Sequence, residues 1–213
     1  MSIDAARDRH GQTDEERIRQ IANELAAGYR VLRSVGPSIT VFGSARTPPG
    51  HPDYELARAI GRELGAAGYA IVTGAGGGLM EAANRGARDA GATSVGCSIE
   101  LPFEHVNDYL DVAVHFRHFF ARKDVFLRFA TAIVVCPGGY GTLDELFEVL
   151  ALLQTGKLPQ LPTVLAGTGE WDGLLGWLRA RALADGRIDP GDFDFVELAG
   201  SADEVRAIVA RES

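Results

Sequence analysis

The chain has 213 residues, of which 46% are apolar and 23% charged, and this composition suffices to build the core of one α/β domain. Its formal net charge is −8 and it contains no long basic run, which argues against a nucleic-acid polymer as a partner. It also lacks both an uninterrupted apolar run of membrane-spanning length and the apolar core of a signal peptide. We therefore expect a cytoplasmic protein without a membrane partner.

The predicted elements begin after a polar segment, residues 1–13, which we expect to be disordered. A single domain is expected over 14–213, starting with an amphipathic helix over 14–34 that carries Ile18, Ile21, Leu25, Tyr29 and Leu32 at helical spacing. The predicted strands lie at 38–42, 69–73, 93–99, 111–116, 131–136, 163–166 and 193–198. The remaining predicted helices lie at 54–67, 79–90, from about 117 through Ala130, from about Thr142 to Gln154, at 171–184 and from Ala202 onward.

This alternation of strands and helices predicts an α/β fold, a Rossmann-like doubly wound parallel sheet with helices on both faces. Ligands of such sheets bind outside the carboxyl ends of the strands. Three glycine-bearing turns follow predicted strands there, at Gly43-Ser44, at 74–78 and at 138–142. The first turn, Gly43-Ser44, is explained as well by a tight strand-to-helix connection as by a ligand site. The second, with Gly74, Gly76 and Gly77 among four glycines in five residues, is harder to explain that way.

The third turn is the most informative segment of the chain, Pro137-Gly138-Gly139-Tyr140-Gly141-Thr142-Leu143-Asp144-Glu145. Glycines there allow positive φ and let a ligand approach the backbone. Exposed N–H groups at a helix N-terminus favour an anion, and we expect this anion to be a phosphate. Because Glu145 falls in the first helical turn, its carboxylate is expected to face the same ligand.

Several other site types are disfavoured by the sequence. It contains no G-x-G-x-x-G, no G-x-x-x-x-G-K-[ST], no H-E-x-x-H and no G-x-S-x-G. The five histidines lack metal-ligand spacing, and neither His115 nor His118 has an evident carboxylate or cysteine partner, so no metal site is predicted. Cys97 and Cys136 lie in apolar runs and are interpreted as buried free thiols, with a disulfide or a metal pair as the minor alternative.

A cluster of basic residues precedes the strand that leads into this motif. It comprises Arg117, His118, Arg122, Lys123 and Arg128. A solvated basic face is the simplest explanation of such a helix. However, the helix leads directly into the strand that ends at Pro137, so its side chains can approach the same pocket.

Together these motifs resemble those of the LOG ("lonely guy") family, cytokinin-activating phosphoribohydrolases that are often mislabelled as lysine decarboxylases. The resemblance covers roughly 38–164 and rests on P-G-G-x-G-T-x-x-E, met by Pro137 through Glu145, and on the upstream pair Arg122-Lys123. A lysine decarboxylase itself is poorly supported, because Lys123 and Lys157 are the only lysines and neither lies in a pyridoxal-phosphate motif.

The resemblance implies hydrolysis of the N-glycosidic bond of nucleoside 5′-monophosphates to a free base and ribose 5-phosphate, without a metal or organic cofactor. It assigns catalysis to Arg122 and Glu145. The substrate-binding candidates are Gly43, Ser44, Gly74, Gly76, Gly77, Glu104, Lys123, Gly138, Gly139, Tyr140, Gly141, Thr142 and Asp144. The resemblance also implies a homodimer, and higher homo-oligomers stay open. The helix after the motif is apolar on nearly all sides, which is typical of a helix at a subunit interface. Burial in the core of one chain explains this pattern almost as well.

Departures from the family pattern leave the base unassigned. Short family members carry Met-His-x-Arg-Lys-x-x-Met, whereas this chain has Phe119-Phe120-Ala121-Arg122-Lys123-Asp124-Val125-Phe126, and AMP is as credible a substrate as a cytokinin nucleotide. Two alternatives stay open. One is a noncatalytic nucleotide or molybdenum-cofactor carrier, which needs the glycine turns but not the Arg122–Glu145 pair. The other is a nucleotidase that releases phosphate.

Overall fold

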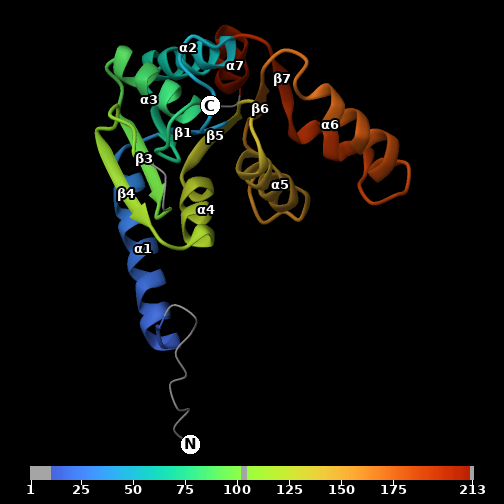
Figure 1. Cartoon of the computed structure of the whole chain (residues 1–213). Helices are drawn as coiled ribbons and strands as arrows, with labels where there is room; N and C mark the ends of the chain where they lie inside the picture. Colours follow the sequence, from blue (N-terminus) through green and yellow to red (C-terminus); the bar gives the residue numbers. More distant parts are fainter. Residues whose placement is uncertain (1–10, 102–104, 212–213) are drawn as a thin grey trace, which may run out of the picture.

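The computed structural model describes residues 11–101 and 105–211 and is built around one parallel sheet (Figure 1). The strand order is β4-β3-β2-β1-β5-β6-β7, and every neighbouring pair is parallel. The strands are β1 (Ser38–Phe42), β2 (Ala70–Thr73), β3 (Ser94–Ile99), β4 (Val112–Phe116), β5 (Ala130–Val135), β6 (Thr163–Ala166) and β7 (Glu197–Ala199). The predicted doubly wound parallel sheet is confirmed.

Helices cover both faces of this sheet (Figure 1). They are α1 (Asp14–Ser34), α2 (Pro52–Ala66), α3 (Leu79–Asp89), α4 (Phe119–Arg128), α5 (Tyr140–Gln154), α6 (Asp172–Trp177) and α7 (Ala202–Ala210). Helices α2, α3 and α7 share one buried apolar cluster with the sheet, and α1, α4, α5 and α6 share the other. The two cores explain why β1, β2 and β3 are buried along their whole length and consist mostly of small and β-branched residues.

Two predicted elements are wrong in extent. The helix expected through Ala130 ends at Arg128, because Ala130 already pairs with Ser38 in the sheet and the Ser38 hydroxyl bonds the Phe129 carbonyl at 3.1 Å. The strand expected over 193–198 begins only at Glu197. Residues Pro190–Phe195 form a 3₁₀ helix instead, with Pro at its start and a capping box that joins Asp189 to Asp192.

The remaining differences are smaller. The helix expected over 171–184 consists of α6 followed by a π-helix at Leu178–Leu183. Helix α5 begins at Tyr140, two residues before the expected start. The predicted disorder of residues 1–13 falls mainly on residues outside the described part of the chain, whereas Thr13 is the N-cap of α1. No described helix combines the length and apolarity needed to cross a membrane.

The chain order creates a switch point in this sheet. From β1 the chain builds outward through β2, β3 and β4, and it then returns to the other side of β1 to add β5, β6 and β7. Ligands of doubly wound sheets bind where the order reverses, outside the carboxyl ends of the strands. The turns that follow β1 and β5 lie at this point.

Candidate active site

The three glycine-bearing turns meet at the carboxyl edge of the sheet. The Ser44 N–H donates to the Pro137 carbonyl at 3.0 Å, and the Leu79 N–H donates to the Ser44 carbonyl at 2.8 Å. The turns after β1, β2 and β5 are thereby joined through Ser44. Gly43 also has a packing role, because a Cβ there would lie 2.8 Å from the Cβ of Leu79 and 3.2 Å from that of Cys136. The turn at Gly43-Ser44 is therefore both a tight connection that packing requires and a part of the candidate site.

The turn after β2 has an unusual backbone. Gly78 has a φ of 64°, and a Cβ there would lie 2.3 Å from the Ser44 carbonyl oxygen. Ala75 also has a positive φ, 68°, which is uncommon outside glycine, and its N–H donates to the Thr73 hydroxyl at 3.0 Å. Local strain of this kind persists where the surrounding structure holds it, and it is concentrated at binding sites.

Two buried asparagines hold this turn, and sequence reasoning missed both. The Asn107 side-chain amide donates to the carbonyls of Ala75 (3.1 Å) and Gly76 (3.0 Å) and to Oδ1 of Asn84 (3.1 Å). Asn84, fully buried in α3, accepts from the Thr73 hydroxyl at 2.6 Å. Both residues lie outside the glycine motifs. The one local signal was a polar residue on the otherwise buried face of α3.

The turn after β5 leads into an open helix N-terminus. Gly139 is the N-cap of α5, and no side chain caps it. A Cβ on Gly138 would lie 2.1 Å from the Thr142 hydroxyl, so this position requires glycine. The positive φ that glycine allows is not used in this turn, because Gly138, Gly139 and Gly141 are not among the residues with positive φ. Close approach requires glycine at Gly138, whereas a Cβ on Gly139 or Gly141 would meet no described atom within 4 Å. The open N-terminus remains suited to an anion.

Glu145 lies one turn into α5 and is only 4% exposed. Its Oε1 is 4.0 Å from an Nη of Arg122, and its Oε2 has no hydrogen-bond partner among the described residues. Burial raises the pKa of Glu145 to about 7, although the charges of Arg122 and Lys123 act in the opposite direction. A buried carboxyl poised near neutrality, with a free oxygen, is a strong candidate for a catalytic group.

Arg122 connects α4 to the other turns. Its guanidinium lies over the rings of Phe119 and Phe126, at 5.3 and 5.4 Å from their centres. A Cβ on Gly74 would come within 3.5 Å of an Arg122 Nη atom. Arg122 thus lies between the turn after β2 and the carboxylate on α5, and the structure brings the two predicted catalytic residues together.

Lys123 is held by two carboxylates. Its ammonium lies 3.0 Å from Asp144 and 2.8 Å from Glu148, so it ties α4 to α5. Burial alone would lower the pKa of Lys123, but the bonds to Glu148 and Asp144 outweigh it and the pKa is raised. Lys123 and Asp144, both predicted as substrate ligands, bind each other. Glu148 was not among the site residues predicted from the sequence. Of the other candidates, Tyr140 is 94% exposed and Glu104 lies outside the described residues.

The cysteines and histidines add two results. Cys97 and Cys136 are free, buried and on opposite faces of the sheet, so the prediction of buried free thiols is confirmed. Burial raises the pKa of each thiol to about 12. The expectation that His118 lacks a carboxylate partner is wrong. Its Nδ1 lies 3.1 Å from Oε1 of Glu24, a residue of α1 that is 94 positions away.

Comparisons with known proteins bear on the family and the fold of this chain. The family model described as "Possible lysine decarboxylase" matches residues 80–209. A cytokinin riboside 5′-monophosphate phosphoribohydrolase of Mycobacterium marinum is 36% identical over 143 residues, which cover 65% of this chain and 76% of that protein. A pyrimidine/purine nucleotide 5′-monophosphate nucleosidase of Escherichia coli is 30% identical over 129 residues. These residues cover 55% of this chain but only 28% of the E. coli protein.

A solved structure supports the fold. The molybdenum cofactor binding protein of Rippkaea orientalis superposes with a TM-score of 0.62 over 82% of this chain and 96% of its own. Its sequence identity is 22%, so the likeness concerns the fold alone.

Proposed function

This chain belongs to the LOG family, and from that premise we propose that it hydrolyses the N-glycosidic bond of nucleoside 5′-monophosphates. Water is consumed, and the products are a free base and ribose 5-phosphate. The observation that carries the proposal is the buried Arg122–Glu145 pair, 4.0 Å apart, one turn from an uncapped helix N-terminus. The N-terminus suits the 5′-phosphate, and the carboxylate suits the reacting end of the ribose.

The chemistry follows from the two groups. As the bond from C1′ to the base nitrogen breaks, its electron pair leaves with the base, and positive charge develops on the ribose. The ionised Glu145 stabilises this charge and accepts a proton from the water whose oxygen bonds C1′. The base takes up a proton from the solvent as it leaves, and Glu145 then releases to the solvent the proton that it accepted, so the carboxylate is regenerated. Arg122 keeps Glu145 partly ionised in a buried environment, because its charge lowers a pKa that burial raises.

The glycine turns supply the phosphate site in this proposal. The N–H groups of Gly139, Tyr140 and Gly141 at the start of α5 face the phosphate, and the joined turn at Ser44 closes the cradle. Lys123 contributes positive charge nearby while it holds α5 through Asp144. Both cytokinin nucleotides and AMP are proposed as substrates, since the relatives are named for cytokinin riboside monophosphates and for purine and pyrimidine nucleotides.

A noncatalytic carrier of a nucleotide or of molybdenum cofactor is the alternative from another class. The likeness to a molybdenum-cofactor binding protein supports the shared fold. The Arg122–Glu145 pair favours the enzyme, because burying a carboxyl at this position raises its pKa and is costly, and a carrier gains nothing from it.

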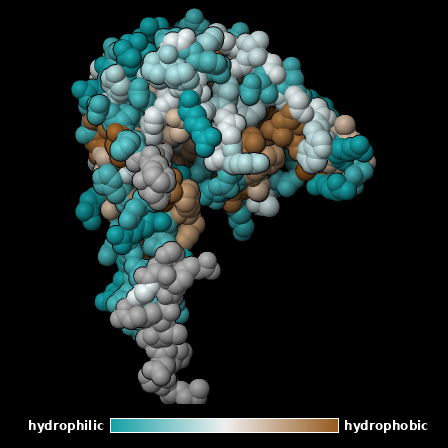
Figure 2. Space-filling view, in the orientation of Figure 1, coloured by the Kyte–Doolittle hydropathy of each residue, from teal (hydrophilic) through white to brown (hydrophobic). Residues whose placement is uncertain are grey.

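We also propose a cytoplasmic homodimer. Helix α5 is only partly covered within one chain, since Phe147 on it is 41% exposed. An apolar groove of about 170 Å³ lies beside it, and apolar side chains gather between α5 and α6 on the surface (Figure 2). The groove is lined mainly by Phe147, Leu150, Leu175, Leu178, Phe193 and Val196. A second copy of the chain would cover this surface.

Product analysis tests the proposed activity. Purified protein is incubated with AMP and with isopentenyladenosine monophosphate, and the products are separated by chromatography. Free base with ribose 5-phosphate is the expected result. Nucleoside with orthophosphate would identify a nucleotidase, and tight binding without turnover would identify a carrier.

A further inference from the structure

Helix α1 buries a carboxylate that the proposed chemistry does not use. Glu24 is 8% exposed and forms, with Gly28 and Leu32, the buried stripe of α1. A buried carboxylate is costly unless it is bonded, so its partners indicate its role.

These partners lie at the start of α4. The helix begins at Phe119, its N-cap is His118, and the His118 side chain makes no capping bond. Glu24 supplies this cap from α1. Its Oε2 accepts the His118 backbone N–H at 3.2 Å, and its Oε1 lies 3.1 Å from the ring Nδ1. Since a carboxylate only accepts, Nδ1 carries the proton. A negative charge at a helix N-terminus also stabilises the helix dipole.

The same turn of α4 carries Arg122. The Arg122 N–H donates to the His118 carbonyl at 3.2 Å, so the capped residue and the arginine are one helical turn apart. Any shift of the cap is transmitted to Arg122 through this turn, because a helix moves as a rigid unit over so short a length. Arg122 lies at the limit of ion-pair distance from Glu145, 4.0 Å, where a small displacement breaks the pair.

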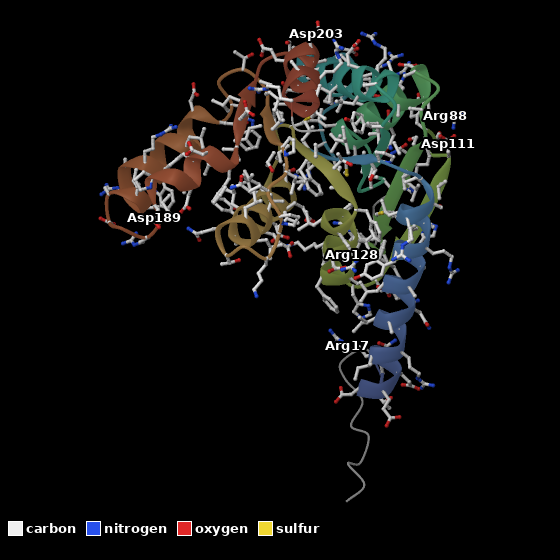
Figure 3. All side chains as sticks on the ribbon, turned by 180° about the vertical axis from the view of Figure 1, so that it is seen from behind. Arg17, Arg88, Asp111, Arg128, Asp189 and Asp203 are labelled. Carbon is white, nitrogen blue, oxygen red and sulfur yellow. The ribbon has the colours of Figure 1, made fainter. Side chains whose placement is uncertain are left out.

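Other contacts between α1 and α4 lie further along both helices. A Cβ on Gly28 would come 2.6 Å from Val125, so the helices touch closely there. The Tyr29 hydroxyl donates to Asp124, and the Arg128 guanidinium lies 4.9 Å from the centre of the Tyr29 ring. Figure 3 shows Arg128 on α4 beside α1. These contacts attach α1 to the second half of α4 and do not touch its N-terminus.

We propose that Glu24 is a positioning residue for Arg122: it caps α4 from α1 and fixes the arginine opposite Glu145. The inference rests on the proposed function for its kinetic consequences. The capping role itself rests on the contacts alone.

Hydrogen exchange tests the capping role without any substrate. In Glu24→Ala, and in Glu24→Gln, which keeps the size of the side chain, amides of residues 118–122 are expected to exchange faster than in the wild type. Tyr29→Phe is the matched control on the same helix pair, and it should leave these amides protected. Unchanged protection in both Glu24 variants would overturn the proposal.

Kinetics test the positioning role. The Glu24 variants should lower kcat by about 10- to 100-fold with KM nearly unchanged, since misplacing a catalytic group by about 1 Å has effects of this size. Glu24→Asp should restore part of kcat, and Tyr29→Phe should keep it.

A double variant separates positioning from general damage to the fold. In an Arg122→Ala background, Glu24→Ala should cause no further loss of kcat, because it acts through the missing arginine. Fully additive losses, or a normal kcat in the Glu24 variants, would overturn the positioning role. Absence of wild-type turnover would instead refute the proposed function, and it would leave the exchange result to decide the capping role.

Discussion

At the scale of single residues, Glu145 is the group on which the proposed activity depends. It is 4% exposed, has one oxygen without a partner among the described residues, and has a pKa near 7. Such an arrangement lowers stability in order to keep a reactive group in place. Both its protonation and its contribution to stability should therefore change within the physiological pH range.

The first prediction concerns stability and pH. The pKa of Glu145 is raised on folding, so ionising it destabilises the folded state, and this cost grows as pH rises from about 4.5 to above 7. It amounts to about 3 kcal/mol at the upper end. Glu145→Gln removes the cost, so urea unfolding should show this variant gaining stability over the wild type between pH 5 and pH 8.

The exposed pair of Glu197 with Arg211 offers a control. Glu197→Gln should differ from the wild type by a nearly constant amount over the same pH range. A constant difference for Glu145→Gln as well would show that Glu145 has an ordinary pKa.

The second prediction concerns the pH dependence of turnover. Because Glu145 acts in its ionised form, kcat should rise with pH and level off above about 7. Glu148 raises the pKa of Glu145, so Glu148→Gln should move this rise to lower pH. The phosphate of the substrate titrates near pH 6, but its titration would not move with Glu148. A rate that falls through pH 7 would make Glu145 a general acid instead.

At the scale of elements, the site is a set of turns held together by buried polar side chains. The three turns were predictable, because glycines directly after strands mark the carboxyl edge of a parallel sheet. The network that fixes the turn after β2 was not, because Asn84 and Asn107 reach it from elements outside any motif.

The third prediction tests this network. Asn107→Ala leaves the carbonyl of Gly76 and Oδ1 of Asn84 without this donor, which should lower the free energy of unfolding by about 1–3 kcal/mol. KM should rise more than kcat falls, since the turn is proposed to bind rather than react. Denaturant unfolding and steady-state kinetics measure the two effects. An unchanged KM would remove the turn after β2 from the binding site.

Periodicity found α1 with its bounds but assigned its buried face only in part. The apolar positions Ile18, Leu25 and Tyr29 predicted the helix, yet Ile18 is 64% exposed. The buried stripe contains Glu24 and Gly28, because α4 offers a helix N-terminus and a close approach rather than an apolar surface. Such a preference depends on the partner helix, which local sequence does not contain.

At the scale of the whole molecule, strand and helix alternation predicted the sheet, and the convergence of its turns followed from the parallel topology. The boundaries of two elements depend on strand pairing between residues that are far apart in the sequence. The pairing of Ala130 with Ser38 ended α4 early, and β7 was shortened because only Glu197 to Ala199 pair with β6. Neither partner lies near in sequence.

The fourth prediction concerns assembly through the apolar surface of α5. If a second copy covers it, light scattering should give a mass near twice the 22.7 kDa of one chain. Phe147→Asp places a charge on this surface and should shift the protein toward the monomer, because burying an unpaired charge is strongly unfavourable. Thr155→Asp, at the exposed end of the same helix, is the control. A wild-type monomer would refute the proposed dimer.

The decisive test of the proposed activity compares the wild type with Glu145→Gln in one assay of base and ribose 5-phosphate release from AMP, with AMP binding measured by calorimetry. We expect the variant to bind AMP with similar affinity and to release base about 10²- to 10⁴-fold more slowly. Equal rates of base release would contradict the proposal that the buried carboxylate of Glu145 drives cleavage of the N-glycosidic bond.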